Sequence, residues 1–184
     1  FMAYTLTLAF GSGVFFSFLA GAPYIVVVVL ERSPLEYGLW FMIVSLGFMT
    51  GNALAGRFSE RIGIDRMIGF GVVLVLGGSV ISMALVLAGF HTPVAIFLPM
   101  ILVALGNGLA LPNGIAGAMS INPALAGTAA GLAGFMQMGL GAALSQSVGA
   151  AQVFSPWASL YVMAASAALA LLAFRWVLVS GRKG

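Results

Sequence analysis

The sequence contains no cysteine and very little charge. The absence of cysteine excludes a disulfide framework, thiol chemistry and a thiolate metal site. Only 6% of the 184 residues are charged, whereas about a quarter are charged in a typical soluble domain. Hydrophobic residues make up 62% of the chain, which indicates a protein that lies in a lipid bilayer.

The small excess of basic residues, seven against four acidic ones, does not indicate nucleic-acid binding. These residues are divided between one connection and the C-terminus, so they are typical of membrane topology signals rather than of a phosphate-binding face. The chain opens as FMAYTLTLAF, without a basic n-region or a small-residue cleavage site. We expect it to begin within a membrane span, as part of a longer protein.

Six stretches contain the roughly 20 mostly apolar residues that a spanning helix requires. The sequence therefore predicts an all-α, polytopic membrane protein. Pro23 is expected to kink or break the first helix, and Pro112 is expected to interrupt the fourth. The predicted helices cover residues of about 3–30, 35–56, 67–90, 94–119, 124–153 and 157–179.

The charged residues predict the orientation of these helices. With six spans, the connection 57–66 and the C-terminus lie on the same side of the membrane. This side carries six basic residues and the other carries only Arg32, so the positive-inside rule places the connection and the C-terminus in the cytoplasm. The six are Arg57, Arg61, Arg66, Arg175, Arg182 and Lys183.

The connection also carries a motif, G-x-x-x-x-G-R-F-x-x-R-x-G, from Gly51 to Gly63. It resembles the Gly-x-x-x-Asp-Arg-x-Gly-Arg-Arg-like signature of the major facilitator superfamily, which recurs in degenerate form in the second half of those proteins. The match covers Gly51, Arg57 and Arg61. It departs from the full, non-degenerate signature at Gly56, where that signature has Asp, and at Ser59, where it has Gly.

Three further segments resemble the bicyclomycin-resistance (Bcr/CflA-type) drug:proton antiporters of that superfamily. They are GAPYI followed by SPLEYGLWF, then RFSERIG, and finally the Pro-Asn and Ala-Gly-Thr-Ala segment within 111–142. The resemblance implies one C-terminal six-helix half, residues 1–184, with the N-terminal half missing. It also implies alternating-access export of small hydrophobic compounds in exchange for protons across the cell's inner (plasma) membrane.

The resemblance further implies that the first, second, fourth and fifth helices face a central cavity. An apolar, aromatic cavity with a few amides suits hydrophobic ligands. For each polar residue within a span, an interhelical hydrogen bond is the alternative to ligand contact. The predicted substrate-binding residues are Phe15, Phe18, Tyr24, Asn107, Asn113 and Gln137.

Glycines at three- or four-residue intervals along the fifth helix, including Gly127, Gly131 and Gly134, predict close helix packing. The same face could slide against a neighbour during alternating access. Gly51, Arg57, Arg61 and Gly63 are predicted to form a gate. In this hypothesis the arginines bind helix C-terminal carbonyl groups of the other half and close the cytoplasmic side. The alternative is that these charges only fix topology.

No catalytic residue, metal or cofactor is expected. Proton coupling in membranes generally uses a buried carboxylate, and no spanning segment here contains one, so the proton carrier is expected in the missing half. His91 is interpreted as a solvated loop histidine. Two alternatives to a transporter are a non-catalytic membrane subunit and a rhomboid-like protease suggested by Ser12. A serine nucleophile requires a base, and His91 lies in a loop.

Overall fold

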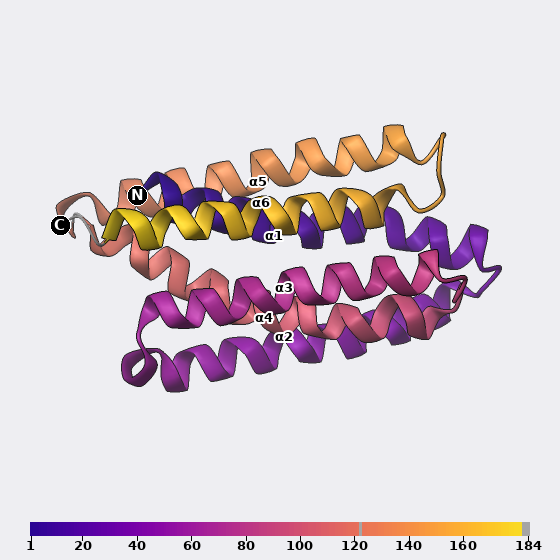
Figure 1. The fold of residues 1–184 in the computed structure, drawn as a ribbon, viewed down its shortest axis with the longest axis horizontal. Coiled ribbons are helices and arrows are strands. Elements are labelled where there is room, and N and C mark those ends of the chain that lie inside the picture. Colours follow the sequence, from indigo (N-terminus) through magenta and orange to yellow (C-terminus); the bar gives the residue numbers. More distant parts are fainter. Residues whose placement is uncertain (122, 182–184) are drawn as a thin grey trace.

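The computed structural model describes residues 1–121 and 123–181. In this part of the chain every regular element is a helix, and six long helices run along the same axis (Figure 1). Their bounds are α1 Met2–Tyr24, α2 Pro34–Ile62, α3 Ile64–Leu87, α4 Pro93–Ser120, α5 Ala126–Ala151 and α6 Ala158–Gly181. The prediction of an all-α, polytopic membrane protein is confirmed.

Five of the described helices are long and apolar enough to cross a membrane, namely α1 to α4 and α6. The remaining long helix, α5, has 26 residues and lies beside the others over a similar length. Six glycines and several polar side chains lower its hydropathy. A helix of this composition is more readily accommodated against protein than against lipid.

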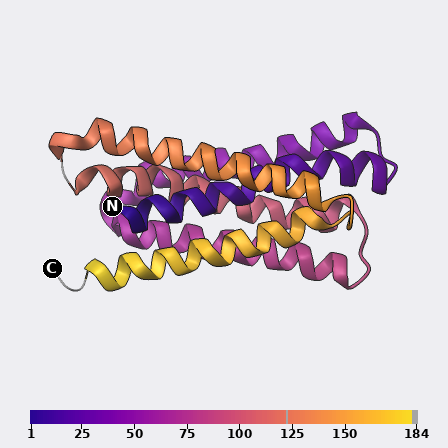
Figure 2. The same ribbon diagram turned by 90° about the horizontal axis from the view of Figure 1, so that it is seen from above.

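The connections alternate between the two ends of the bundle. The turn at Gly63 lies at the same end as the beginning of α1 and the end of α6 (Figures 1 and 2). The connections from α1 to α2, α3 to α4 and α5 to α6 lie at the opposite end. Arg57, Arg61 and Arg66 are thus separated from Arg32, as predicted, whereas Arg182 and Lys183 lie outside the described residues.

Pro23 does not end the first helix, so of the kink or break expected at the GAP segment, the break is wrong. The chain continues as a π-helix from Ile25 to Val29. A π-turn restores hydrogen bonding beyond a proline that has no N–H to donate. Pro112 likewise lies inside a helix that continues to Ser120. Neighbouring helices can satisfy the backbone groups that a proline leaves unpaired within a membrane helix.

The prediction of a loop at residues 57–66 is wrong. Helix α2 continues through Arg57 and Arg61 to Ile62, and α3 begins at Ile64. A 29-residue helix is about 43 Å long at 1.5 Å per residue. The hydrocarbon core of a bilayer is about 30 Å thick, so the charged end of α2 can remain helical in the interfacial region.

Local sequence signals explain where two of the helices begin. The Ser33 hydroxyl oxygen accepts a hydrogen bond from the Glu36 backbone N–H at 3.2 Å, and Pro34 occupies the first helical position of α2. Thr92 accepts a hydrogen bond from the Ala95 N–H at 3.3 Å, and α4 begins with Pro93. A serine or threonine cap followed by proline is a favourable helix start.

Helix α4 lies at the centre of the bundle, where it contacts α1, α2, α3 and α5. Its contact with α3 is close because both helices present glycine there. A Cβ atom on Gly71 would lie 2.5 Å from the Gly106 carbonyl oxygen, and one on Gly78 would lie 2.6 Å from that of Pro99. Helices α3 and α6 complete one side of the bundle, whereas α2 and α5 flank α1 and α4 on the other.

Candidate functional site

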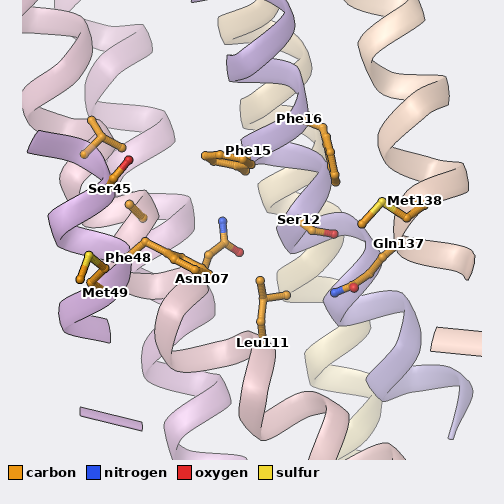
Figure 3. A pocket seen from close by; sticks show the side chains of 12 residues that line it. Ser12, Phe15, Phe16, Ser45, Phe48, Met49, Asn107, Leu111, Gln137 and Met138 are labelled. Carbon is orange, nitrogen blue, oxygen red and sulfur yellow. The ribbon is translucent and has the colours of Figure 1, made fainter. Parts of the chain in front are cut away.

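A pocket of about 320 Å³ lies between the four helices α1, α2, α4 and α5 (Figure 3). Each helix contributes residues that share one of its faces, because positions three or four apart are neighbours on a helix surface. No charged residue is among those that line the pocket. They are Ser12, Phe15, Phe16, Val44, Ser45, Phe48, Met49, Ala104, Asn107, Leu111, Gln137 and Met138.

Aromatic and other apolar side chains form most of the pocket surface. The rings of Phe15 and Phe16 lie edge to face, with 6.2 Å between their centroids. Phe15 also lies 6.3 Å from Phe41, measured between ring centroids. Phe48 and Met49 come from the opposite wall on α2. This surface offers contact area to an apolar ligand and few directional interactions.

Asn107 is the most unusual residue of the pocket. Its side chain is 97% buried, and neither its Nδ2 nor its Oδ1 atom has a hydrogen-bond partner among the described residues. A Cβ atom on Gly11 would lie 3.3 Å from Asn107 Oδ1, so the glycine leaves space for the amide. Leaving a buried polar group unpaired costs about 1–3 kcal/mol. Such a group is more easily explained by binding than by stability.

The other polar groups of the pocket differ in whether they are already paired. The Ser12 hydroxyl donates to the Leu8 carbonyl oxygen at 2.8 Å, and the Ser45 hydroxyl donates to that of Phe41 at 2.9 Å. In the described structure the Gln137 side chain, on α5, forms no hydrogen bond. Two primary amides, Asn107 and Gln137, are therefore the free hydrogen-bonding groups with donors.

The structure brings together three of the six predicted substrate-binding residues, namely Phe15, Asn107 and Gln137. Phe18 is instead fully buried and packs edge to face on Phe97, with 5.4 Å between ring centroids. Tyr24 lies at the end of α1 with 38% of its surface exposed. Neither of these two lines the pocket, because each faces another direction on α1.

Asn113 also lies away from this pocket. Its side-chain amide donates to the Leu109 carbonyl oxygen at 2.8 Å, within α4. It lines a separate cleft at the Gly63 end of the bundle, with Tyr4 and Asp65. There the Tyr4 hydroxyl donates to Asp65 Oδ1 at 2.5 Å and joins the beginning of α1 to that of α3. The Asn113 amide nitrogen thus donates within α4 rather than between helices, and its predicted contact with a ligand stays a prediction.

Several pocket residues were not among the predicted ones. Phe48 and Met49 carried no signal in the sequence, because α2 is apolar around much of its circumference and its pocket face is not marked. Ser45 and Leu111 likewise carried no signal in the sequence. Only Asn107 could have been used as a reference point, since Ala104 and Leu111 lie three and four residues away and hence on its face.

The predicted gating residues divide between two environments. Gly51 is buried in α2 where it packs closely on Gly108 and the Leu105 carbonyl group of α4. Gly63 has φ +95° and forms the whole connection between α2 and α3. Arg57 and Arg61 are exposed on the last two turns of α2. The proposed contacts of these arginines with another half stay a prediction.

Three glycines predicted to pack helix α5 have open space beside them in the described part of the chain. A Cβ atom added to Gly127, Gly131 or Gly134 would meet nothing within 4 Å in the described structure. In contrast, Gly141, farther along α5, packs against the Phe16 ring of α1. Close packing of the first three therefore stays a prediction about a surface outside this six-helix unit.

The serine and histidine of the protease alternative form separate interactions. The Ser12 hydroxyl is bonded within α1, as described above. The His91 ring stacks on Trp157, with 4.8 Å between centroids, and its Nε2 atom lies 3.2 Å from the Val86 carbonyl oxygen. His91 is thus an exposed residue of a connection, as interpreted from the sequence, and it also joins two connections through Trp157. It does not serve Ser12 as a base.

One curated protein is similar in sequence to this chain. It is an uncharacterized MFS-type transporter, YdgK, of Bacillus subtilis (strain 168), with 27% identity over 154 residues. The match covers 81% of this chain and spans 37% of the relative. No family model matches the sequence. The similarity supports membership of the major facilitator superfamily, in agreement with the resemblance of the motif around Gly51–Gly63.

Proposed function

We propose that this chain is the C-terminal six-helix half of a secondary transporter and that the pocket around Asn107 is part of its substrate site. In this arrangement a preceding six-helix half covers the pocket from the side of α2 and α5. Transport then proceeds by alternating access, with the two halves rocking around a ligand near the middle of the membrane.

The observation that carries the proposal is the position of the pocket. It is bounded by α1, α2, α4 and α5, on the side of the bundle where the exposed glycines of α5 also lie. The side chains of Phe15, Asn107 and Gln137 reach it from three helices (Figure 3). The matched relative contains more chain outside the matched segment than within it, which is consistent with a second half.

The finer proposal is a Bcr/CflA-type exporter of small hydrophobic drugs or metabolites. The apolar lining of the pocket suits such ligands. Proton exchange requires an ionisable carrier, and none of the lining residues is acidic or basic. We place the proton carrier in the preceding half for this reason. The proposed location is the inner (plasma) membrane.

The proposed orientation places the Gly63 end of the bundle in the cytoplasm, by the positive-inside rule. Since the chain has no cysteine, single cysteines can be introduced directly at exposed positions of opposite ends. Glu60→Cys should react with a membrane-impermeant maleimide only from the cytoplasmic side, and Phe90→Cys only from outside. Labelling with the reverse sidedness would contradict the orientation.

Transport by the intact protein is tested in inverted membrane vesicles incubated with a lipophilic fluorescent dye such as Nile red in the external solution. We expect energised vesicles to accumulate the dye and the Phe15→Ala plus Gln137→Leu variant to lose most of this uptake, about tenfold. Phe70→Ala, which alters an exposed ring on α3, is the matched control and should retain it. Inserted wild-type protein without dye movement would favour a non-catalytic membrane subunit instead.

A further inference from the structure

We infer that the ligands of this pocket are uncharged lipophilic molecules that carry an amide-like group, with a hydrogen-bond donor beside an acceptor, for recognition by Asn107. The inference rests on the proposed function and names the chemical class of its substrate. It assigns to Asn107 the role of the residue that determines specificity, through the two atoms of its side-chain amide.

Only some of the hydrogen-bonding groups in the pocket remain free. Asn107 has an unpaired Nδ2, which can donate twice, and an unpaired Oδ1, which accepts. The hydroxyl hydrogens of Ser12 and Ser45 are directed to backbone carbonyl groups of their own helices. These serines therefore present only oxygen lone pairs to a ligand. The groups that can both donate and accept are the amides of Asn107 and Gln137.

A primary amide is matched best by a group of the same kind. A carboxamide, lactam or imide can donate to Oδ1 and accept from Nδ2 at the same time, so that both atoms of Asn107 are paired in one planar contact. An ester or ketone pairs only Nδ2 and leaves Oδ1 buried without a partner. The site then retains part of the cost of an unpaired polar group, which is the usual basis of discrimination between such ligands.

Charged ligands are disfavoured by the same lining. Burying an ionised carboxylate or ammonium group without a counter-charge is unfavourable, and none of the twelve lining residues is ionisable near neutral pH. The Asn107 amide is 97% buried, so water does not readily screen a charge placed beside it. The pocket thus selects against ions and in favour of neutral polar groups.

The surrounding rings define the rest of the ligand. Asn107 lies between Phe15 and Leu111, with Phe48 close to it and Gln137 on the far side of the pocket (Figure 3). The amide group of a ligand bound to Asn107 would be flanked by apolar side chains. A volume of about 320 Å³ is sufficient for a bicyclic aromatic body, and pockets for small ligands begin at about 300 Å³.

The test compares three probes that share one aromatic body and differ only in the polar group. They are naphthalene-2-carboxamide, methyl naphthalene-2-carboxylate and the naphthalene-2-carboxylate anion. Binding to the intact full-length protein is measured by equilibrium dialysis at neutral pH. We expect the carboxamide to bind about tenfold more tightly than the ester, and the anion to bind more weakly than either.

The Asn107→Leu variant keeps the approximate size of the side chain and removes its hydrogen-bonding groups. The ratio of amide to ester affinity should fall to about one, with ester affinity retained or increased. Asn52→Leu is the matched control, because the Asn52 amide donates to the Phe48 carbonyl oxygen within α2 and does not line the pocket. That variant should keep the tenfold preference.

The outcomes separate this inference from the proposed function. Equal binding of amide and ester by the wild-type protein, tight binding of the anion, or an unchanged ratio in Asn107→Leu would overturn the inference alone. Transport of Nile red would still stand in those cases. A protein that binds none of the three probes and moves no dye would overturn both.

Discussion

Two glycines of α3 and α4, Gly71 and Gly106, and three of α5, Gly127, Gly131 and Gly134, have opposite surroundings in the structure. Gly71 and Gly106 lie where two helices touch, and a Cβ atom on either would meet the backbone of the other helix. Gly127, Gly131 and Gly134 have nothing within 4 Å of the same position. The difference teaches that small residues permit close approach, while the helix arrangement decides where it occurs.

The side of the bundle formed by α3, α4 and α6, the closed side, is packed within this chain; the side formed by α2 and α5 is the open side. Helices α3 and α4 pack through glycine, and α6 packs on α1 and α3. On the open side, α2 is buried over only 22% of its apolar window, compared with 67% for α4. Mutations on the closed side should therefore change the stability of the six-helix unit. Under the proposed function, mutations on the open side should change its interactions with the preceding half.

The largest effect on stability is expected for Gly71→Ala. The new Cβ atom would lie 2.5 Å from the Gly106 carbonyl oxygen and 2.8 Å from the Ala110 Cβ atom, so α3 and α4 must separate. We expect the free energy of unfolding in detergent to fall by about 2–3 kcal/mol. Gly77→Ala, in the same helix with open space at its Cβ position, is the control and should cause no loss. Equal effects of the two would show that glycine does not set this interface.

A smaller effect is expected from Tyr4→Phe. This variant removes the hydroxyl group that donates to Asp65 but keeps the ring that packs beside Gly117. The loss of one partly exposed hydrogen bond should lower the free energy of unfolding by about 1 kcal/mol. Tyr161→Phe alters a tyrosine that is 45% exposed on α6 and serves as the control. An unchanged melting temperature for Tyr4→Phe would show that the Tyr4–Asp65 hydrogen bond does not stabilise the contact between α1 and α3.

Gly131→Leu should change stability by no more than about 0.5 kcal/mol, because a Cβ atom at this position meets nothing within 4 Å in the described part of the chain. Under the proposed function it should nevertheless reduce dye uptake by the intact transporter, since it obstructs the surface that faces the preceding half. Gly77→Leu, on α3, adds the same side chain on the opposite side of the bundle. If both variants transport equally well, α5 does not face a partner through Gly131.

A similarly small effect on stability is expected for the double variant Arg57→Gln plus Arg61→Gln. Both arginines are exposed, and surface charges contribute about 0–1 kcal/mol at most. If they close the cytoplasmic side as proposed, the rate of transport changes while the amount of inserted protein stays the same. Normal insertion with a normal rate of transport would indicate that these arginines only fix the topology.

The number, type and approximate bounds of the helices could be predicted because each of these properties depends on local sequence. Runs of about 20 apolar residues require helices in lipid. Ser33, Pro34 and Thr92, Pro93 mark two helix starts. The continuation of α2 through its charged end could not be predicted from hydropathy, because a helix outside the hydrocarbon region has no need to be apolar.

The candidate site was only partly predictable for a related reason. Asn107 and Gln137 are conspicuous as amides within apolar helices, and both line the pocket. Phenylalanines are not conspicuous in this way: Phe15 lines the pocket, whereas Phe18, three residues later, is in the core against Phe97. A helix that is apolar all round does not reveal which face meets which neighbour.

Gly63 is the entire link between α2 and α3, and this constrains how the open side can move. Ile62 and Ile64 are two Cα steps apart, so they cannot separate by more than about 7.6 Å. Helix α2 can pivot at this single joint, yet it cannot travel lengthwise past α3 by a turn unless one of them unwinds. Any movement of the pocket wall that carries Phe48 is thus limited to a change of angle about this joint, and a lengthwise shift of that wall is prevented.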